Sequence, residues 1–337
     1  MSAPDADPVL DLIEAFRRSK TMFAAVALGV FDRFEQAPAN AAELATELGT
    51  ATEPLERLLD SCAALGLLRK SDGRYSNQPV ASVYLRRESA QTLTGYILYS
   101  NAVLYPLWAH LEDAVREGSH RWKQTFGADG PIFDHFFKTD EAMRTFLEGM
   151  HGFGLLSSPK VVCAFDLTRF RKFADLGGAT GHLAIAACEH YPALRGVVFD
   201  LPRVIDVARE HVVQSPARDR IELIPGDFFR DELPEADLFA VARILHDWSD
   251  EKIGALLEKI YRRLPPGGGL LIGERLIRED RTGPLSAFMQ SLNMLVCTEG
   301  KERTLGEYRA LLVAVGFREV EGCVTGVPLD AVLAIKP

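Results

Sequence analysis

The stretch from residue 171 to residue 192, RKFADLGGATGHLAIAACEHYP, limits most narrowly how this chain can fold. It reads as an apolar strand, a turn rich in glycine and an alanine-rich helix, and the apolar run that follows ends at Asp200. The three together predict one strand–helix–strand unit. Glycines between strand and helix leave backbone N–H groups uncovered and make room for a ligand. A nucleoside-bearing cofactor is therefore the first hypothesis.

The turn itself narrows the choice of cofactor. A dinucleotide-binding turn requires G-x-G-x-x-G, whereas residues 177–181 read GGATG, which fits that pattern poorly. The chain also contains no G-x-x-x-x-G-K-[ST] sequence, so a P-loop is not predicted. An acidic residue followed by spaced glycines instead suits S-adenosylmethionine, which carries no phosphate. A nucleotide-dependent oxidoreductase is the weaker enzyme alternative.

Length and composition predict a globular protein of two domains. The chain has 337 residues, of which 47% are hydrophobic and 25% are charged, and it can bury a large core. Its net charge of -9 argues against binding to nucleic acid or to an anionic membrane. The acidic start lacks the pattern of a secretory signal, and no apolar run is long enough to span a membrane. A cytoplasmic protein is therefore expected.

The cysteines predict neither disulfides nor a metal site. They are odd in number and never occur in C-x-x-C spacing, which is typical of reduced thiols in an intracellular protein. They are Cys62, Cys163, Cys188, Cys297 and Cys323. We therefore expect no bound metal.

Three segments are predicted along the chain. Residues 1–90 read as a long helix, two shorter helices and a hairpin that turns at residues 71–73, an order typical of a winged-helix dimerisation domain. Residues 91–165 read as helical and rich in aromatic side chains, some of which we expect to line a pocket for a flat ligand. Residues 166–337 read as the catalytic domain that binds the cofactor.

A winged helix can also bind DNA, which makes a regulator that senses a small molecule the binding-module alternative. DNA recognition would require a basic second helix. Residues 53–65 instead consist mostly of Leu, Ala, Glu and Asp, with Arg57 as their one basic residue. Dimerisation is therefore the preferred interpretation of this domain.

Strand and helix patterns alternate through the last segment. The expected strands are FADL, GVVFD, IELIPGD, LFAVARIL and GLLIGERL, and helices are expected near residues 182–190, 203–213, 250–263 and 304–315. This alternation predicts an α/β fold with a doubly wound, mainly parallel sheet whose ligand site lies at the carboxyl ends of the strands. The last two apolar runs predict a hairpin that adds a reversed edge strand. That is the class I methyltransferase variant of the Rossmann-like fold.

Four further segments carry a resemblance to a known family. They are GDFF at 226–229, ARILHDWSD at 242–250, PPGGGLLIGERL at 265–276 and SLNMLVCTEGKERT at 291–304. Together they resemble the plant-type small-molecule O-methyltransferases, and within that group they are most similar to the hydroxyindole (acetylserotonin) O-methyltransferases. The resemblance covers nearly the whole chain. One departure from the family motif is Ala179, where glycine is common.

The resemblance implies an enzyme that transfers a methyl group from S-adenosylmethionine to the hydroxyl of a small aromatic molecule, leaving S-adenosylhomocysteine. It implies His246 as the general base, with Glu274 and Glu302 as the acids that flank and orient it. A hydroxyindole is the best-matched acceptor, and phenolic, polyketide or phenazine natural products are the alternatives. A phenolic hydroxyl has a pKa of about 10, so a histidine of pKa about 6.5 is needed to accept its proton near neutral pH.

The resemblance also assigns residues to the two ligands. The residues expected at the cofactor are Asp175, Gly177, Gly178, Asp200, Leu201, Gly226, Asp227, Phe228 and Arg243. Of these, Asp200 would bind the ribose hydroxyls, and Asp227 with Phe228 would bind the adenine. The residues expected at the substrate are Asp247, Asn293, Phe146 and Met150.

Two expectations concern the remaining sequence. Members of the family form intertwined homodimers, and SKTMFAAVALGVFD resembles the exchanged segment, so Met22 or Phe23 would reach the partner's substrate. Among the other histidines, His182 is interpreted as a helix cap, while His151 and His211 are interpreted as surface or packing residues.

Overall fold

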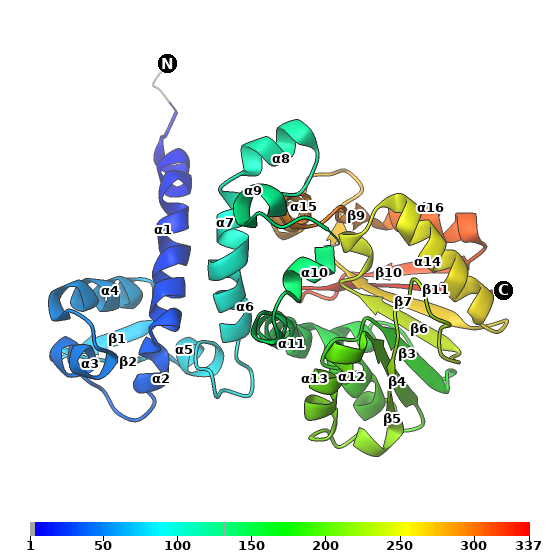
Figure 1. Ribbon diagram of the computed structural model, residues 1–337, viewed down its shortest axis with the longest axis horizontal. Coiled ribbons are helices and arrows are strands. Elements are labelled where there is room, and N and C mark those ends of the chain that lie inside the picture. The colour runs from blue at the N-terminus through cyan, green and yellow to red at the C-terminus, as the bar shows by residue number, and fades with distance from the viewer. Residues whose placement is uncertain (1–3, 131) are drawn as a thin grey trace. The chain divides into compact units, whose positions relative to one another are not determined.

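The computed structural model describes residues 4–130 and 132–337 of the chain. Their contacts divide the chain into two compact units, Met1–Val103 and Leu104–Pro337 (Figure 1). The division lies inside the segment 91–165, which the sequence predicts to be helical. Among the described residues, no helix is long and apolar enough to cross a membrane.

The N-terminal unit is helical with a small β-hairpin, in the predicted order. Its elements are α1 (Asp7–Ala27), α2 (Val30–Arg33), α3 (Ala41–Leu48), α4 (Thr52–Ala64), β1 (Leu68–Ser71), β2 (Arg74–Asn77), α5 (Pro79–Tyr84) and α6 (Thr94–Tyr99). Asn40 begins α3 with a capping box, and Gly49 ends it at a left-handed φ of 65°. Asp72 and Gly73 both have positive φ, as a two-residue type I′ hairpin turn requires.

The first half of α1 carries an apolar face that is exposed. The core of this unit is formed by side chains such as Phe31, Leu44 and Leu59, together with the last turns of α1. Further toward the N-terminus the apolar side chains of α1 are more than half exposed, and they are Val9, Leu10, Leu12, Ile13 and Phe16. A contiguous exposed apolar face of this kind marks an interaction surface.

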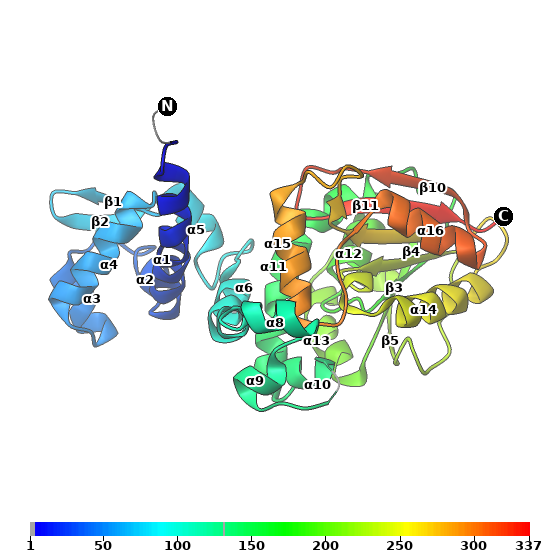
Figure 2. The ribbon, with the colours of Figure 1, turned by 90° about the horizontal axis from the view of Figure 1, so that it is seen from above.

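The C-terminal unit contains a twisted seven-stranded sheet (Figure 2). Its strands are β3 (Lys172–Leu176), β4 (Arg195–Asp200), β5 (Ile221–Pro225), β6 (Leu238–Ala242), β7 (Gly269–Glu274), β10 (Arg318–Cys323) and β11 (Asp330–Ile335). They lie in the order β10-β11-β7-β6-β3-β4-β5. The strands β5, β4, β3, β6 and β7 pair in parallel, whereas β11 pairs antiparallel with both of its neighbours.

The predicted α/β fold with a terminal hairpin and one reversed strand is confirmed. The reversed strand is β11, and it lies one place in from the edge of the sheet. Its hairpin partner β10 pairs on its outer side and runs parallel to the rest of the sheet again. The edge position therefore belongs to β10, because β11 pairs with the buried strand β7 through all six of its residues.

Helices cover both faces of this sheet. The helices of this unit are α7 (Tyr105–Trp108), α8 (Leu111–Glu117), α9 (Trp122–Phe126), α10 (Ile132–Phe136), α11 (Asp140–Val162), α12 (His182–His190), α13 (Pro202–Val212), α14 (Asp250–Arg263), α15 (Leu285–Cys297) and α16 (Leu305–Val315). Side chains of α14 and α16 share one buried core with the sheet, and side chains of α11, α12 and α13 share the other. Two short strands, β8 (Leu276–Ile277) and β9 (Arg303–Thr304), pair outside the main sheet.

Candidate active site

The strand order reverses at β3, which pairs with β4 on one side and with β6 on the other. In an open α/β sheet this switch point leaves a crevice beyond the carboxyl ends of the strands, and ligands bind there. The glycine turn that follows Leu176 lies at this position. The structure therefore places the predicted cofactor turn at the predicted edge of the sheet.

The turn adopts a backbone conformation that depends on its glycines. Gly177 and Gly181 have φ of 68° and 81°, and Ala179 has φ of 51°, in the left-handed region that most residues avoid. A Cβ at Gly177 would lie 2.5 Å from the Ile244 side chain, and a Cβ at Gly178 would lie 2.9 Å from the Asp175 carboxylate. Both predicted glycines thus sit where a side chain has no space.

Two acids stand beside this turn. Asp200 ends β4 and accepts the backbone N–H of Ala179 at 2.8 Å and that of Leu201 at 2.7 Å. Asp175 is buried in β3, and its Oδ2 has no hydrogen-bond partner. Burial raises the pKa of Asp175 to about 7, with a further contribution from the charge of Asp200, and burial raises the pKa of Asp200 to about 6. Both carboxyl groups therefore titrate near neutral pH in the free protein.

These raised values predict how cofactor affinity changes with pH. S-Adenosylmethionine is cationic, and ribose hydroxyls donate to a carboxylate, so binding favours the ionised form of both acids. Affinity should therefore rise as pH increases through about 6 to 7 and should fall below that range, where the ligand must displace a proton. Titration calorimetry at several pH values, in buffers of different ionisation enthalpy, measures both the affinity and the released protons. An affinity that is flat across this range would contradict the assignment, and Asp200→Asn should bind weakly at every pH.

The predicted adenine residues follow β5 and meet the same crevice. The N–H of Gly226 donates to the carbonyl oxygen of Asp200 at 2.9 Å. A Cβ at Gly226 would lie 2.3 Å from the Phe199 ring, so this approach also depends on glycine. Asp227 accepts the N–H of Phe229 at 2.8 Å. The strand ends β3, β4 and β5 thus converge on one crevice.

The ring of Phe228 lies beside the glycine turn, since a Cβ placed on Gly177 would come within 3.3 Å of it. Lys259 of α14 donates to the carbonyl oxygen of Phe228 at 2.9 Å and so holds the loop that follows β5. The loop that carries Phe228 is therefore fixed against the predicted cofactor turn.

The expected strand LFAVARIL would end directly before His246, but this residue lies in a 3-10 turn formed by Leu245–Asp247. The strand β6 ends at Ala242, and the chain then leaves the sheet through Arg243, which has a left-handed φ of 56°. Glu274, at the end of β7, fixes the turn with one carboxylate oxygen. This Oε1 accepts the backbone N–H groups of Ile244, Leu245 and His246 at 3.0, 2.9 and 3.4 Å.

The ring of His246 is held by the second acid. Its Nδ1 lies 2.7 Å from Oε1 of Glu302 in a hydrogen bond. Oε2 of Glu274 lies 3.0 Å from the same nitrogen but is not aligned for a hydrogen bond. All three residues are at most 2% exposed. Because Nδ1–H of His246 donates a hydrogen bond to the carboxylate of Glu302, Nε2 is left free to accept a proton.

Several acids crowd this histidine, and burial raises the pKa of each. The pKa of Glu302 is raised to about 8, and those of Glu274 and Asp247 are raised to about 7. The charge of His246 opposes this shift for Glu274 and Asp247, and that of Arg243 opposes it for Glu302. The three acids therefore interact electrostatically with one another and with the charges of His246 and Arg243.

The same three side chains are of types that also bind metals. Among the described residues, one ligand atom each from His246, Glu274 and Glu302 lies within 4.8 Å of the others. The atom that faces both acids is Nδ1, whose proton serves the hydrogen bond to Glu302. We interpret the cluster as a hydrogen-bonded base, and the absence of a metal stays a prediction.

The residues predicted at the substrate lie on three elements. Asp247 is buried beside His246, with its Oδ1 3.7 Å from Nε2. Asn293 is buried on α15 and accepts the indole N–H of Trp108 at 2.9 Å. Phe146 and Met150 lie on α11 and are partly buried. The structure places all four in the C-terminal unit, and their contact with substrate stays a prediction.

Phe146 packs close to the glycine turn. It lies against a small hydrophobic cluster of α11 and α13 side chains, as Leu201 and Ala179 also do. Its ring lies 4.8 Å from that of Phe136, measured between centroids. Arg243, predicted beside the cofactor, lies over the ring of Phe153 at 5.5 Å, and its buried Nε has no hydrogen-bond partner. Helix α11 thus packs against the glycine turn.

The contacts of three histidines near the glycine turn were not predicted from the sequence. His182 does not cap α12, since Gly181 is the N-cap residue and no side chain caps the helix. Its Nδ1 instead lies 2.8 Å from Oγ of Ser158 on α11. His151 and His211 stack with a centroid distance of 4.1 Å, next to the turn. Isolated histidines on separate helices give no local signal, so the sequence could not bring them together.

Comparison with known proteins decides the family. A model of the O-methyltransferase domain matches residues 108–318, and a model of the O-methyltransferase dimerisation domain matches residues 10–87. The chain belongs to the O-methyltransferase family. As a member of that family, it is an S-adenosylmethionine-dependent methyltransferase.

Individual relatives of this O-methyltransferase agree over nearly its full length. Acetylserotonin O-methyltransferase of Bos taurus is 42% identical over 328 residues, which are 95% of this chain and 95% of that protein. The crystal structure of human N-acetylserotonin methyltransferase in complex with S-adenosylmethionine has a TM-score of 0.94 and 39% identity, and the match covers 99% of both chains. The predicted resemblance is therefore confirmed.

A third relative is longer than this O-methyltransferase. The probable bifunctional dTTP/UTP pyrophosphatase/methyltransferase protein of Homo sapiens is 42% identical over 331 residues, which are 97% of this chain. The chain spans 53% of the length of that protein, or about half. The match therefore concerns one part of that relative.

Proposed function

We propose that this enzyme transfers the methyl group of S-adenosylmethionine to the hydroxyl of a small hydroxyindole such as N-acetylserotonin. The observation that carries the proposal is the position of His246. The turn that holds this buried base packs against the glycine turn, since Ile244 fills the space beside Gly177. Base and cofactor turn therefore share one crevice. The acceptor class is supported by the acetylserotonin O-methyltransferases, which match nearly the full chain.

The proposed reaction is a single displacement of the methyl group from sulfur to oxygen. S-Adenosylmethionine supplies a methyl group on a sulfonium that needs no further activation. The acceptor oxygen forms a bond to the methyl carbon as the carbon–sulfur bond breaks, and S-adenosylhomocysteine leaves. His246 Nε2 takes the hydroxyl proton, Glu302 stabilises the imidazolium through Nδ1, and Glu274 holds the turn in place. Alignment of the reacting groups contributes as well.

A direct methyl-transfer assay tests this function. The purified chain is incubated with methyl-labelled S-adenosylmethionine and, in turn, N-acetylserotonin, a catechol and a hydroxyphenazine. We expect label on the hydroxyl oxygen, with the largest kcat/KM for N-acetylserotonin. A larger kcat/KM for the catechol or the phenazine would reassign the acceptor to a natural product, and no transfer to any hydroxyl would reject the function.

We also propose how the chain is divided. Residues 1–90 would form a winged-helix domain that pairs two copies in an intertwined homodimer, residues 91–165 would line the acceptor pocket, and residues 166–337 would hold the cofactor. The dimerisation-domain match and the exposed apolar face of α1 support the pairing. Light scattering should give twice the chain mass of 37.2 kDa, and a monomer would refute it.

Two finer points belong to this proposal. Met22 and Phe23 are partly buried against the core of the N-terminal unit, and we propose that their exposed remainder reaches the acceptor of the partner copy. We also propose a cytoplasmic location, which is supported by five cysteines that are all free thiols. Cell fractionation that recovers the protein outside the cytosol would refute this location.

A further inference from the structure

A series of polar contacts fastens α11 to the glycine turn, and the proposed reaction does not use it. Thr180 is the fourth residue of the turn and is completely buried. Its Oγ1 lies 2.8 Å from Nδ1 of His151 on α11, within hydrogen-bond distance. A buried hydroxyl without a partner is costly, so this contact matters to the turn that carries Thr180.

His151 is itself held in place from α13. Its ring stacks on that of His211 with a centroid distance of 4.1 Å. Nε2 of His211 lies 3.0 Å from Oε1 of Glu148, to which it donates, and Glu148 lies one helical turn before His151 on α11. The contacts therefore run from the turn to α11, across to α13 and back to α11. His151 has little freedom to leave Thr180.

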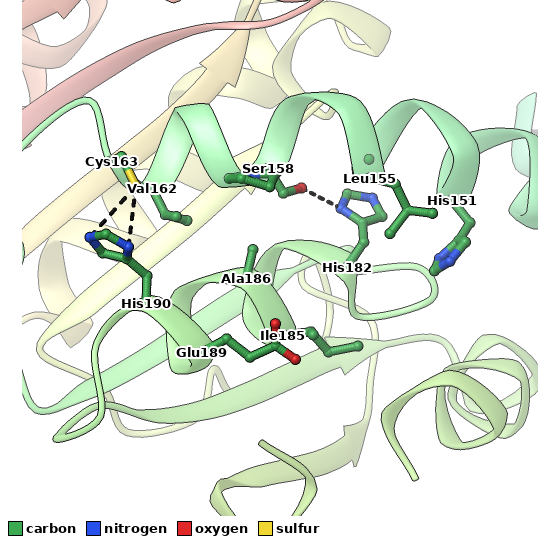
Figure 3. Close-up of a pocket in the computed structure, with 12 residues that line it drawn as sticks. His151, Leu155, Ser158, Val162, Cys163, His182, Ile185, Ala186, Glu189 and His190 are labelled. Atoms are coloured by element: carbon green, nitrogen blue, oxygen red, sulfur yellow. Dashed lines mark hydrogen bonds between the residues drawn. The ribbon is translucent and has the colours of Figure 1, made fainter. Parts of the chain in front are cut away.

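A second contact joins α11 to the residue that follows the turn. His182 is the first residue of α12, and its Nδ1 lies 2.8 Å from Oγ of the buried Ser158 (Figure 3). A Cβ at Gly154 would lie 2.2 Å from the His182 ring, so α11 approaches this ring closely at a glycine. His151, His182 and Ser158 also line a groove of about 380 Å³ between α11 and α12. The turn is thus flanked by two contacts to one helix.

These histidines are unsuited to proton transfer at neutral pH. Burial lowers the pKa of His151 to about 4 and that of His182 to about 3. The charges of His211 and Glu148 also act on His151. Those of His151, Arg243 and His211 also act on His182. Both imidazoles are therefore neutral hydrogen-bonding groups in the working enzyme. This favours a role in holding the backbone over a role in the chemistry.

We propose that His151 is a positioning residue for cofactor binding, acting through its hydrogen bond to Thr180. The turn needs such support because Ala179 holds a left-handed φ of 51°, a conformation disfavoured for any residue with a Cβ. Without the anchor, the turn relaxes and the hydrogen bond from the Ala179 N–H to Asp200, the predicted ribose-binding acid, is disturbed. The inference rests on the proposed function in one respect, namely that S-adenosylmethionine binds at this turn.

A double-mutant cycle on cofactor affinity tests the proposal. His151→Ala, Thr180→Val and the double variant are titrated calorimetrically with S-adenosylhomocysteine. Each single change removes one side of a single hydrogen bond, so each should weaken binding about fivefold to tenfold. The affinity of the double variant should be no lower than that of the single variant with the lower affinity, because both changes remove the same contact. Losses that add in full would overturn the proposal.

Conservative variants separate positioning from general packing. His151→Asn and Thr180→Ser keep a hydrogen-bonding atom and should bind close to the unchanged protein. In steady-state assays, His151→Ala should raise KM for S-adenosylmethionine while kcat at saturation stays within about twofold. Failure of the asparagine to restore affinity, or a fall in kcat with KM unchanged, would contradict the role. Thr180→Val is nearly isosteric, so it keeps the test available should His151→Ala fail to fold.

Titration of the unchanged protein separates failure of the proposed function from failure of the inference about His151. If the unchanged protein does not bind S-adenosylhomocysteine, the proposed function fails. If the unchanged protein binds it and His151→Ala binds it equally well, the function stands and only the inference about His151 is wrong.

Discussion

Replacing His246 with alanine is expected to lower turnover by about 10²- to 10⁴-fold while leaving the dissociation constant for S-adenosylhomocysteine nearly unchanged. The side chain is the proposed proton acceptor, and its loss leaves the hydroxyl protonated during attack. The residues that we predict to bind the cofactor lie mainly at the ends of β3, β4 and β5. Initial rates at saturating cofactor and acceptor, with calorimetry on the same preparations, measure both quantities.

Substitution of an exposed histidine provides a control for the loss of an imidazole ring as such. His190 is exposed at the end of α12 and has no part in the proposed chemistry. His190→Ala should keep turnover within about twofold of the unchanged protein. Near-normal turnover in His246→Ala would mean that the base lies elsewhere.

Adding one methyl group at Gly300 is expected to cost about 10²-fold in turnover. A Cβ there would lie 2.2 Å from the carbonyl oxygen of His246 and 2.8 Å from the backbone nitrogen of Trp248. Neither atom can rotate away, so the whole 3-10 turn must shift by roughly 1 Å, and a misplacement of that size can cost such a factor. The rate of Gly300→Ala under saturating conditions measures the effect, and calorimetry should show cofactor affinity largely retained.

Gly254 provides the control for this substitution. It lies in α14, close in sequence to the same turn, and a Cβ there would meet nothing within 4 Å. Gly254→Ala should leave turnover unchanged and raise the melting temperature slightly, since alanine favours a helix. Equal activity of the two alanine variants would contradict a turn that is fixed by close backbone contact.

Much of the fold could be read from the sequence because its signals are local. The glycine turn follows directly on β3, and Asp200 ends the next strand, so spacing alone predicted their meeting at one edge. The alternation of apolar runs likewise predicted the sheet. The position of β11 between β7 and β10 could not be predicted from local sequence patterns, because the sequence of a hairpin does not show which of its strands pairs with the sheet.

The base required more than local patterns. The LHDW segment and family resemblance pointed to His246, but its hydrogen bond to Glu302 spans 56 residues of sequence. No spacing rule reports that one oxygen of Glu274 accepts three backbone N–H groups. The contact between His151 and Thr180 was missed for the same reason, because each residue alone is ordinary and only the packing of α11 on the turn joins them.

The most direct test of this account is a crystal structure of the chain with S-adenosylhomocysteine and a hydroxyindole acceptor. We predict that the homocysteine portion lies over residues 177–181 and that the acceptor hydroxyl lies within hydrogen-bond distance of Nε2 of His246. A hydroxyl bound away from that nitrogen, or a cofactor product bound outside the crevice, would contradict it.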